Sequence, residues 1–309
     1  MKVLVFDPGY GDVKYALVDI DKGEVQTGKF PTLITEARKG IDFEDEESGL
    51  FWAGKEYLVG KEAAFLGRTL DPTTDNFLET FIPLLLAKTL LDIGQERVDK
   101  VIIAVSLYDW PRRKLIENSA KQVVLKDHKF EHEVLTVPQG YGIWFDKLAP
   151  NDGIVIDIGF RTVDVLSLDE EGKPEGKFSF GIADLGVKYF VDDVANLLSE
   201  EAKDKFTAGE IMYFLQKKRS ILRRLGIEKE IEARIDGWLT LLWNTLLTRK
   251  NFRRAVFLKE DRVVVAGGGA LFFREPEDGF PCRMTIVKES PEFANVRGIA
   301  KWILQEAQP

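Results

Sequence analysis

The sequence has few of the residues that stabilise secreted proteins, and it lacks the long apolar runs that cross membranes. Its single cysteine, Cys282, excludes an internal disulfide and gives no sign of an oxidising compartment. No uninterrupted apolar run is long enough to span a bilayer. Asp7 interrupts the first apolar stretch at once, so we expect no signal peptide. These absences predict a soluble cytoplasmic protein with no direct insertion into a membrane.

Net charge and chain length further restrict the possible functions and the number of domains. Lys and Arg number 43 against 51 Asp and Glu, a net charge of -8, which argues against a generic nucleic-acid binder. The 309 residues are 45% hydrophobic, enough to build one very large domain or two lobes.

The most informative segment begins with an apolar strand that ends in an acidic residue. Asp7 closes this strand and is followed by Gly9 and Gly11. Lys14 then lies at the start of a second apolar strand. We call residues 9–11 the first turn.

The same pattern returns about half a chain later. Asp157 closes an apolar strand, Gly159 follows it, and Thr162 and Asp164 precede or begin the next strand. We call residues 159–162 the second turn. One such hairpin is often only a β-hairpin with turn glycines. Two of them predict related lobes that each present a strand, an Asp and a Gly turn to one shared cleft.

These residue types suit a polyphosphate. Glycine lets a phosphate approach the backbone, whose N–H groups form an anion-binding concavity. A carboxylate beside phosphate requires a cation between them, so Asp7 and Asp157 are predicted to hold Mg²⁺ through its waters. Lys14 is placed to touch phosphate as a point charge.

A third glycine segment lies near the end of the chain. A β-branched strand runs into Gly267, Gly268 and Gly269, where a flat ring or ribose could lie against bare backbone. Phe272 could then cover one side of the ring. The alternative is a tight strand-to-helix turn.

Taken in order, these three motifs resemble the two phosphate motifs and the adenosine motif of the actin/Hsp70/sugar-kinase ATPase superfamily. Within it, the chain is most similar to prokaryotic actin-like proteins of the ParM/StbA type and their archaeal relatives. The resemblance implies an α/β, actin-like (ribonuclease H-like) fold with two related lobes around a nucleotide cleft. It places residues 1–148 and the C-terminal helix 292–307 in the first lobe, with a small inserted subdomain at about 32–71, and residues 149–291 in the second.

The resemblance also implies site residues. The segment around Gln139 is similar to the one that orients the attacking water, and Gly186 to the helix start after the second phosphate motif. Gln216 or Lys217 corresponds to the stretch that reaches adenine. The remaining residues expected to contact nucleotide, from the turns and the glycine run, are Gly9, Tyr10, Gly11, Lys14, Gly159, Phe160, Arg161, Thr162, Gly267, Gly268, Gly269 and Phe272.

Three departures from the family pattern affect this expectation. Tyr10 stands where actin has a small hydroxyl residue, so one phosphate hydrogen bond is lost or moved. Pro8 removes one N–H donor from the loop. Residue 139 is Gln, as in actin, whereas ParM has Glu, which bears on the rate of hydrolysis and leaves its type unchanged.

The implied activity is hydrolysis of ATP to the diphosphate with Mg²⁺, with GTP as an alternative nucleotide. Catalysis would rest on Asp7, Asp157 and Gln139, through positioning and charge stabilisation. The implied partner is the protein itself, in head-to-tail filaments for plasmid segregation or a cytoskeletal role, with a DNA-bound adaptor protein as a further partner.

Two other classes stay open. A metabolite kinase of the same superfamily would need a carboxylate base, for which Asp164 or Asp184 could be nominated. A scaffold would bind nucleotide and a partner without polymerising. Hydrolysis without a second substrate argues against the kinase, and pelleting with ATP distinguishes filaments from both.

Surface charge suggests how filaments would form. An acidic stretch, residues 42–47, contains Phe43 and precedes Phe51 in the inserted subdomain, and basic residues gather at 217–224 and 249–254. These are expected to meet between subunits, unless they are ordinary solvated surfaces. His128 and His132 could pair on a metal, but no third soft ligand accompanies them.

Periodicity predicts the elements. Expected strands are 2–7, 13–20, 25–30, 101–106, 133–137, 153–158, 163–168, 176–181 and 262–267. Expected helices are 76–91, 112–126, 186–198, 208–225, 231–247 and 292–307, with Pro83 kinking the first or lying in its first turn.

Overall fold

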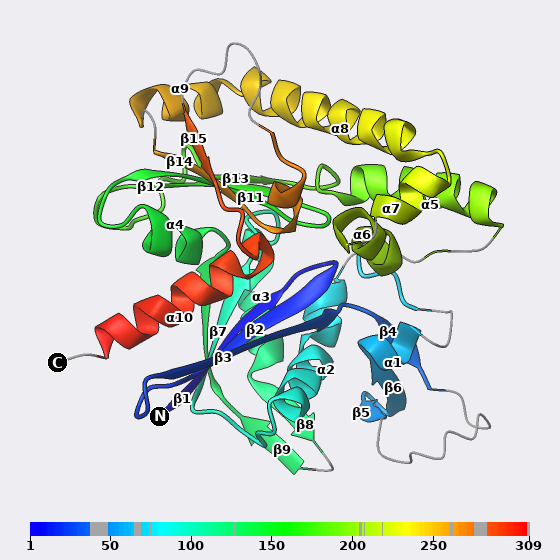
Figure 1. The fold of residues 1–309 in the computed structure, drawn as a ribbon. Helices are drawn as coiled ribbons and strands as arrows, with labels where there is room; N and C mark the ends of the chain where they lie inside the picture. The colour runs from blue at the N-terminus through cyan, green and yellow to red at the C-terminus, as the bar shows by residue number, and fades with distance from the viewer. Residues whose placement is uncertain are drawn as a thin grey trace. The chain divides into compact units, whose positions relative to one another are not determined.

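The computed structural model of the chain describes residues 1–37, 49–64, 69–74, 76–125, 128–203, 206, 208–217, 219–259, 262–274 and 283–307. The chain divides into two compact units (Figure 1). Unit 1 comprises Met1–Gly142 and Asn295–Pro309, and unit 2 comprises Ile143–Ala294. The predicted acidic stretch 42–47 lies outside the described residues.

Unit 1 is built on a five-stranded mixed sheet with the order β10-β7-β1-β2-β3. β1 is antiparallel to β2 and parallel to β7, and it is buried from Val3 onward. Strands covered on both faces read as continuous apolar runs, which explains the first residues of the sequence. The strands are β1 (Lys2–Pro8), β2 (Asp12–Asp19), β3 (Glu24–Pro31), β7 (Lys100–Val105) and β10 (Glu133–Pro138).

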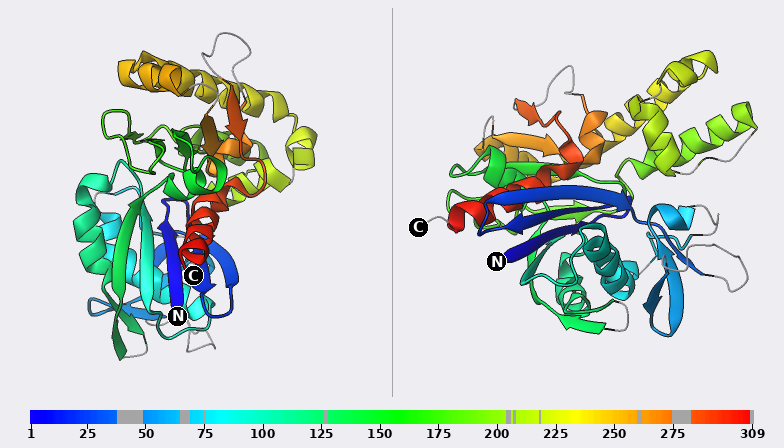
Figure 2. Two further views of the ribbon diagram at one scale, coloured as in Figure 1. Left: turned by 90° about the vertical axis from the view of Figure 1, so that its left-hand side faces the viewer. Right: turned by 60° about the horizontal axis from the view of Figure 1, so that its bottom comes forward.

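Helices cover both faces of this sheet. α2 (Phe77–Asp92) and α3 (Arg113–Ala120) lie on one face, and α10 (Ala294–Glu306) lies over the other (Figure 2). α10 packs backbone against backbone, because a Cβ on Gly298 would lie 1.8 Å from the carbonyl oxygen of Gly142. Asn295 adds a hydrogen bond, accepting the Gly140 N–H at 2.8 Å.

Smaller elements complete unit 1. The inserted segment forms a three-stranded sheet of β4 (Ile34–Glu36), β6 (Lys55–Val59) and β5 (Leu50–Trp52), followed by α1 (Lys61–Ala64). η1 (Trp110–Arg112) precedes α3, and β8 (Gln122–Leu125) pairs with β9 (His128–Glu131). The chain passes into unit 2 within α4 (Tyr141–Lys147).

Unit 2 is built on a second five-stranded mixed sheet with the order β13-β12-β11-β14-β15. Its strands are β11 (Gly153–Ile158), β12 (Val163–Leu168), β13 (Phe180–Ile182), β14 (Val263–Ala266) and β15 (Met284–Ile286). Its further elements are α5 (Lys188–Ala202), α6 (Ala208–Lys217), α7 (Arg219–Arg224), α8 (Glu228–Thr248), α9 (Lys250–Leu258), η2 (Gly268–Leu271) and η3 (Pro291–Phe293). Trp238 and Trp243 are core residues.

The two sheets repeat one topology. In each, a buried central strand has an antiparallel hairpin partner on one side and a parallel strand on the other, with β1 corresponding to β11, β2 to β12 and β7 to β14. Asp7 and Asp157 therefore lie near the C-terminal ends of equivalent strands.

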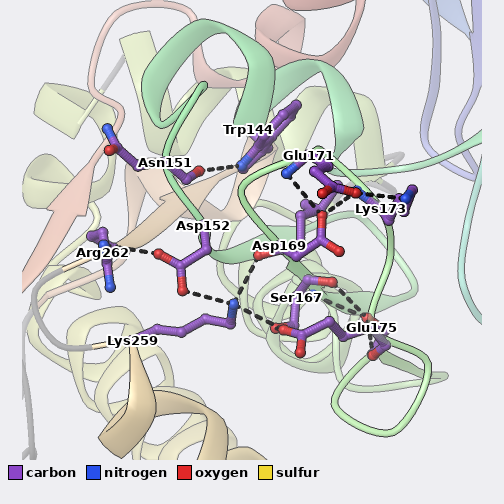
Figure 3. Close-up of polar contacts among 12 residues, drawn as sticks. Trp144, Asn151, Asp152, Ser167, Asp169, Glu171, Lys173, Glu175, Lys259 and Arg262 are labelled. Carbon is purple, nitrogen blue, oxygen red and sulfur yellow. Dashed lines mark hydrogen bonds and ion pairs between the residues drawn. The ribbon is translucent and has the colours of Figure 1, made fainter.

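A buried ion-pair network closes the opposite end of the unit 2 hairpin (Figure 3). The Lys259 ammonium lies 3.1 Å from Asp152 and 2.8 Å from Glu175, and donates to the Leu168 carbonyl at 2.8 Å. Arg262 pairs with the other oxygen of Asp152 at 2.8 Å. A buried ammonium with two carboxylates and a carbonyl is fully compensated, so this network anchors the start of β11 and the end of β12.

Several predicted boundaries were wrong. The helix expected at 112–126 ends at Ala120, because Val123 and Val124 belong to a β-branched run that pairs as a strand. The helix expected at 208–225 is divided into α6 and α7, and the strand expected at 176–181 is limited to β13. Pro83 lies in the interior of α2, beyond the first turn.

Candidate functional site

The first turn is held mainly through its carbonyl groups. Thr32 is fully buried; its hydroxyl donates to the Gly9 carbonyl at 2.6 Å and its N–H to the Gly11 carbonyl at 2.9 Å. A Cβ on Gly9 would lie 2.8 Å from the backbone carbonyl oxygen of Asp12, so this position suits glycine. The Lys14 ammonium lies beside the same position. The predicted residues of the first turn and Lys14 are thus brought together.

Asp7 is the buried carboxylate of this group. It is 3% exposed and lies opposite Lys14 in the β1–β2 register. Gln139 reaches it from the end of β10, its side-chain amide donating to Asp7 Oδ1 at 2.6 Å. Burial raises the pKa of Asp7, against the opposing effects of Lys14 and the Gln139 hydrogen bond. Two predicted catalytic residues from distant parts of the chain therefore meet directly.

Tyr10 uses its side chain in another way. It is 7% exposed, and its hydroxyl donates to Asp109 Oδ2 at 2.8 Å. Asp109 is fully buried and pairs with Arg112, which also lies 3.1 Å from Glu79. Although burial alone would lower it, the Asp109 hydrogen bond and the charges of Asp109 and Glu79 raise the pKa of Arg112.

The sequence interpretation missed Asp109, whose partner Tyr10 lies 99 residues away in the chain. It also gave no role to Asn295, which bonds a residue 155 positions away. Neither residue stands in a recognisable local motif, so no signal in the sequence marked them.

In unit 2, the second turn leads from β11 into β12. The Gly159 N–H donates to the Thr162 carbonyl at 2.9 Å, which closes the turn. Asp157 is 7% exposed and lies opposite Asp164 in the β11–β12 register. Asp164 is buried and accepts a hydrogen bond from the Thr162 hydroxyl at 3.3 Å.

Two glycines fit closely around this turn. Gly267 has φ +82°, and a Cβ on it would lie 2.3 Å from Asp157 Oδ1. A Cβ on Gly186 would lie 2.4 Å from the Phe160 carbonyl oxygen, and the Gly186 N–H donates to the Arg161 carbonyl at 3.0 Å. The predicted Asp157, second turn, Gly186 and Gly267 are therefore neighbours within unit 2.

Other predicted residues stand apart from this group. Phe272 is a core residue, with its ring 5.3 Å from that of Phe190, so it fills the interior instead of offering an open surface for a ring. Gly268 and Gly269 form the start of η2, and Gly269 packs on Ile158. The side chains of Gln216 and Lys217 lie outside the described residues.

Asp7 and Asp157 are the type of ligand that a hard cation uses when most of its coordination is completed by water. No group of three or more His, Cys, Asp or Glu able to hold a metal occurs among the described residues. Each hairpin carries one buried carboxylate, the type of oxygen donor that Mg²⁺ uses alongside waters and phosphates. His132 is buried and its Nδ1 lies 3.1 Å from the Val98 carbonyl, while the side chain of His128 is not described.

Comparison with known proteins identifies the fold. Residues 155–276 match the family model of the C-terminal part of the archaeal actin homologue MreB-like proteins. Among solved structures, the archaeal actin homologue Ta0583 in complex with ADP aligns at a TM-score of 0.67 and 18% identity, covering 99% of this chain and 100% of that one. ParM of Bacillus thuringiensis with ATP aligns at 0.65 and 17%, covering 99% of each chain.

A third similar structure is a 15-stranded ParM filament from Clostridium botulinum, at a TM-score of 0.62 and 19% identity, with 98% of this chain and 99% of that one covered. No protein of curated function matches in sequence. The chain therefore has the α/β actin-like fold with two sheet-based units, and the predicted fold class is confirmed. Its likeness to prokaryotic actin homologues is likewise confirmed. No described helix is long and apolar enough to cross a bilayer.

Proposed function

We propose that this protein is an actin-like ATPase that binds ATP with Mg²⁺, hydrolyses it and assembles in a nucleotide-dependent way. The observation that carries the proposal is the pair of equivalent hairpins, each with a buried carboxylate beside a glycine turn. A buried carboxylate without such a task is costly, because burial disfavours its charged form. The relatives crystallised with ADP and with ATP support the same ligand.

We assign the phosphates to Lys14 and to backbone N–H groups of the two turns other than those of Gly9 and Gly159, which donate to carbonyl groups within their own hairpins. Asp7 and Asp157 would hold the waters of the cation. When bound, Mg²⁺ supplies neutralisation of the charge that develops on the phosphates. Purified protein incubated with ATP·Mg²⁺ and no second substrate should release phosphate. Release of phosphate only after a hydroxyl-bearing metabolite is added would instead indicate a metabolite kinase.

Gln139→Ala is expected to slow turnover by about tenfold or more while nucleotide affinity stays nearly unchanged. A side chain that positions water acts on the transition state more than on the ground state. Single-turnover hydrolysis and equilibrium binding of ATP measure the two quantities separately. Gln95→Ala, an amide removed elsewhere in unit 1, is the control. A large loss of ATP binding with normal turnover would assign Gln139 a structural role instead.

Self-association is the second part of the proposal. α9 presents Arg253 and Arg254 to solvent, together with Phe257 at 71% and Leu258 at 53% exposure. Basic side chains beside exposed apolar ones suit an acidic surface of another subunit in a head-to-tail, unclosed assembly. The ParM filament with the same fold supports such an arrangement.

Arg253→Glu combined with Arg254→Glu is therefore expected to reduce ATP-dependent assembly severalfold without changing ATP binding by monomers. Light scattering and pelleting with ATP against ADP measure assembly, and added salt should weaken the wild type as it screens these charges. The matched control is Lys22→Glu with Lys229→Glu, two exposed cations elsewhere. Equal assembly of all three proteins would exclude α9 from the interface, and a strictly monomeric wild type would favour the scaffold.

A further inference from the structure

Two side chains support the first turn from two directions, through contacts within the protein. Thr32 holds the carbonyls of Gly9 and Gly11. Tyr10, between these glycines, carries its ring into the protein and donates its hydroxyl to Asp109 at 2.8 Å. The Tyr10 side chain is thus committed to the interior, and only its backbone is left to meet a phosphate.

The acceptor of this hydrogen bond is itself fixed. Asp109 follows β7, its N–H donates to the Ser106 carbonyl at 3.0 Å, and its own carbonyl accepts the Arg112 N–H at 2.8 Å. Its carboxylate pairs with Arg112, which lies 3.1 Å from Glu79 in the first turn of α2. Tyr10 is therefore tied through a charge-assisted hydrogen bond to a network that joins β7, η1 and α2.

Peptide geometry gives this support a consequence. In a trans peptide the carbonyl and the following N–H point in opposite directions. Because the Gly9 carbonyl points to Thr32, the N–H of Tyr10 points away from Thr32. The hydrogen bond of the Tyr10 side chain to Asp109 restrains the backbone of Tyr10 as well. The direction of the Tyr10 N–H is therefore restrained both by the preceding carbonyl and by the residue's own side chain.

We propose that Tyr10 and Thr32 are positioning residues that preorganise the first turn for phosphate, with the Tyr10–Asp109 hydrogen bond as the anchor. The inference rests on the proposed nucleotide binding. It gives Tyr10 a role that replaces the missing small hydroxyl residue: its backbone meets the phosphate while its hydroxyl holds the backbone in place. A preorganised donor pays less ordering cost on binding than a mobile one.

The test is Tyr10→Phe, which removes one oxygen and keeps the ring. ATP affinity should weaken about tenfold, because binding must then supply the free energy that orders the turn. Tyr57→Phe, in the small sheet of unit 1, is equally buried and should leave affinity unchanged. Thermal unfolding without nucleotide is measured alongside, because a merely structural tyrosine would alter stability and leave affinity at the wild-type value.

Variants at Thr32 and Asp109 test the same inference if the Tyr10→Phe protein does not fold. Thr32→Val removes the hydroxyl at nearly constant volume and should also weaken ATP binding, whereas Thr32→Ser should restore it. In a cycle with Asp109→Asn, the double variant with Tyr10→Phe should lose little more affinity than the larger single loss. If the folded wild type binds no nucleotide, the proposed function fails. If it binds ATP and the folded Tyr10→Phe or Thr32→Val variant binds within about twofold of it, only this inference is overturned.

Discussion

Asp157→Ala is expected to abolish ATP hydrolysis and leave a folded protein. Asp157 ends a buried strand, lies against Gly267 and is 7% exposed, so its carboxylate is positioned by the fold without being needed to fill the core. Loss of a metal-holding carboxylate removes charge stabilisation from the transition state, an effect on the order of 100-fold or more. Phosphate release at saturating ATP·Mg²⁺ measures the loss, and circular dichroism checks the fold.

The control is Asp193→Ala, which removes an exposed carboxylate from α5 in the same unit and should retain full activity. Asp157→Asn separates charge from shape, because it keeps the volume beside Gly267 and should be nearly as inactive. Hydrolysis by Asp157→Ala within about threefold of the wild type, less than about 1 kcal/mol in the barrier, would refute the metal role.

Asp7→Asn is expected to produce opposite changes in activity and stability. Hydrolysis should fall on the order of 100-fold for the same reason as at Asp157. Without nucleotide, the variant should unfold at a temperature higher by about 2–4 °C at neutral pH, if removing the buried charge gains about 1 kcal/mol. The hydrogen bond from Gln139 can be kept, since asparagine retains an oxygen acceptor.

The stability difference between the wild type and Asp7→Asn is expected to depend on pH. Burial raises the pKa of Asp7 above its ordinary 3.8, so the folded state favours the protonated acid. The wild type is therefore fully stabilised by the neutral acid below pH 3.8 and loses that contribution as pH rises through the folded pKa. The stability advantage of Asp7→Asn should shrink as pH falls from neutral towards 3.8. Thermal unfolding of both proteins across this range is the measurement, and an advantage that is constant or grows on acidification would contradict it.

The parts of the fold that the sequence predicts are those whose causes are local. The hairpins around Asp7 and Asp157 could be read because an apolar run, an acidic residue and turn glycines lie within a few positions. The helix expected at 231–247 could be predicted in the same way, and α8 contains it. The likeness of the two hairpins then suggested two related lobes, and the repeated strand order of the two sheets has that form.

The features that could not be predicted from the sequence include side-chain contacts between residues far apart in the chain. The anchoring of Tyr10 could not be predicted because Asp109 lies far along the chain, and Phe272 was interpreted as a ring cover because Phe190 is equally remote in the sequence. The end of α3 at Ala120 has a local cause that was missed, because the β-branched residues after it pair in a short hairpin with β9.

The position of α10 in unit 1 has a consequence for synthesis of the chain. The whole of unit 2, residues 143–294, is translated before α10, while unit 1 still lacks the helix that packs on Gly142. Unit 2 can therefore complete its own core as a continuous segment, whereas unit 1 must wait with one face of its sheet uncovered. Since domains form as units during synthesis and late long-range contacts slow folding, nascent unit 1 exposes its apolar sheet surface for longer than unit 2 does.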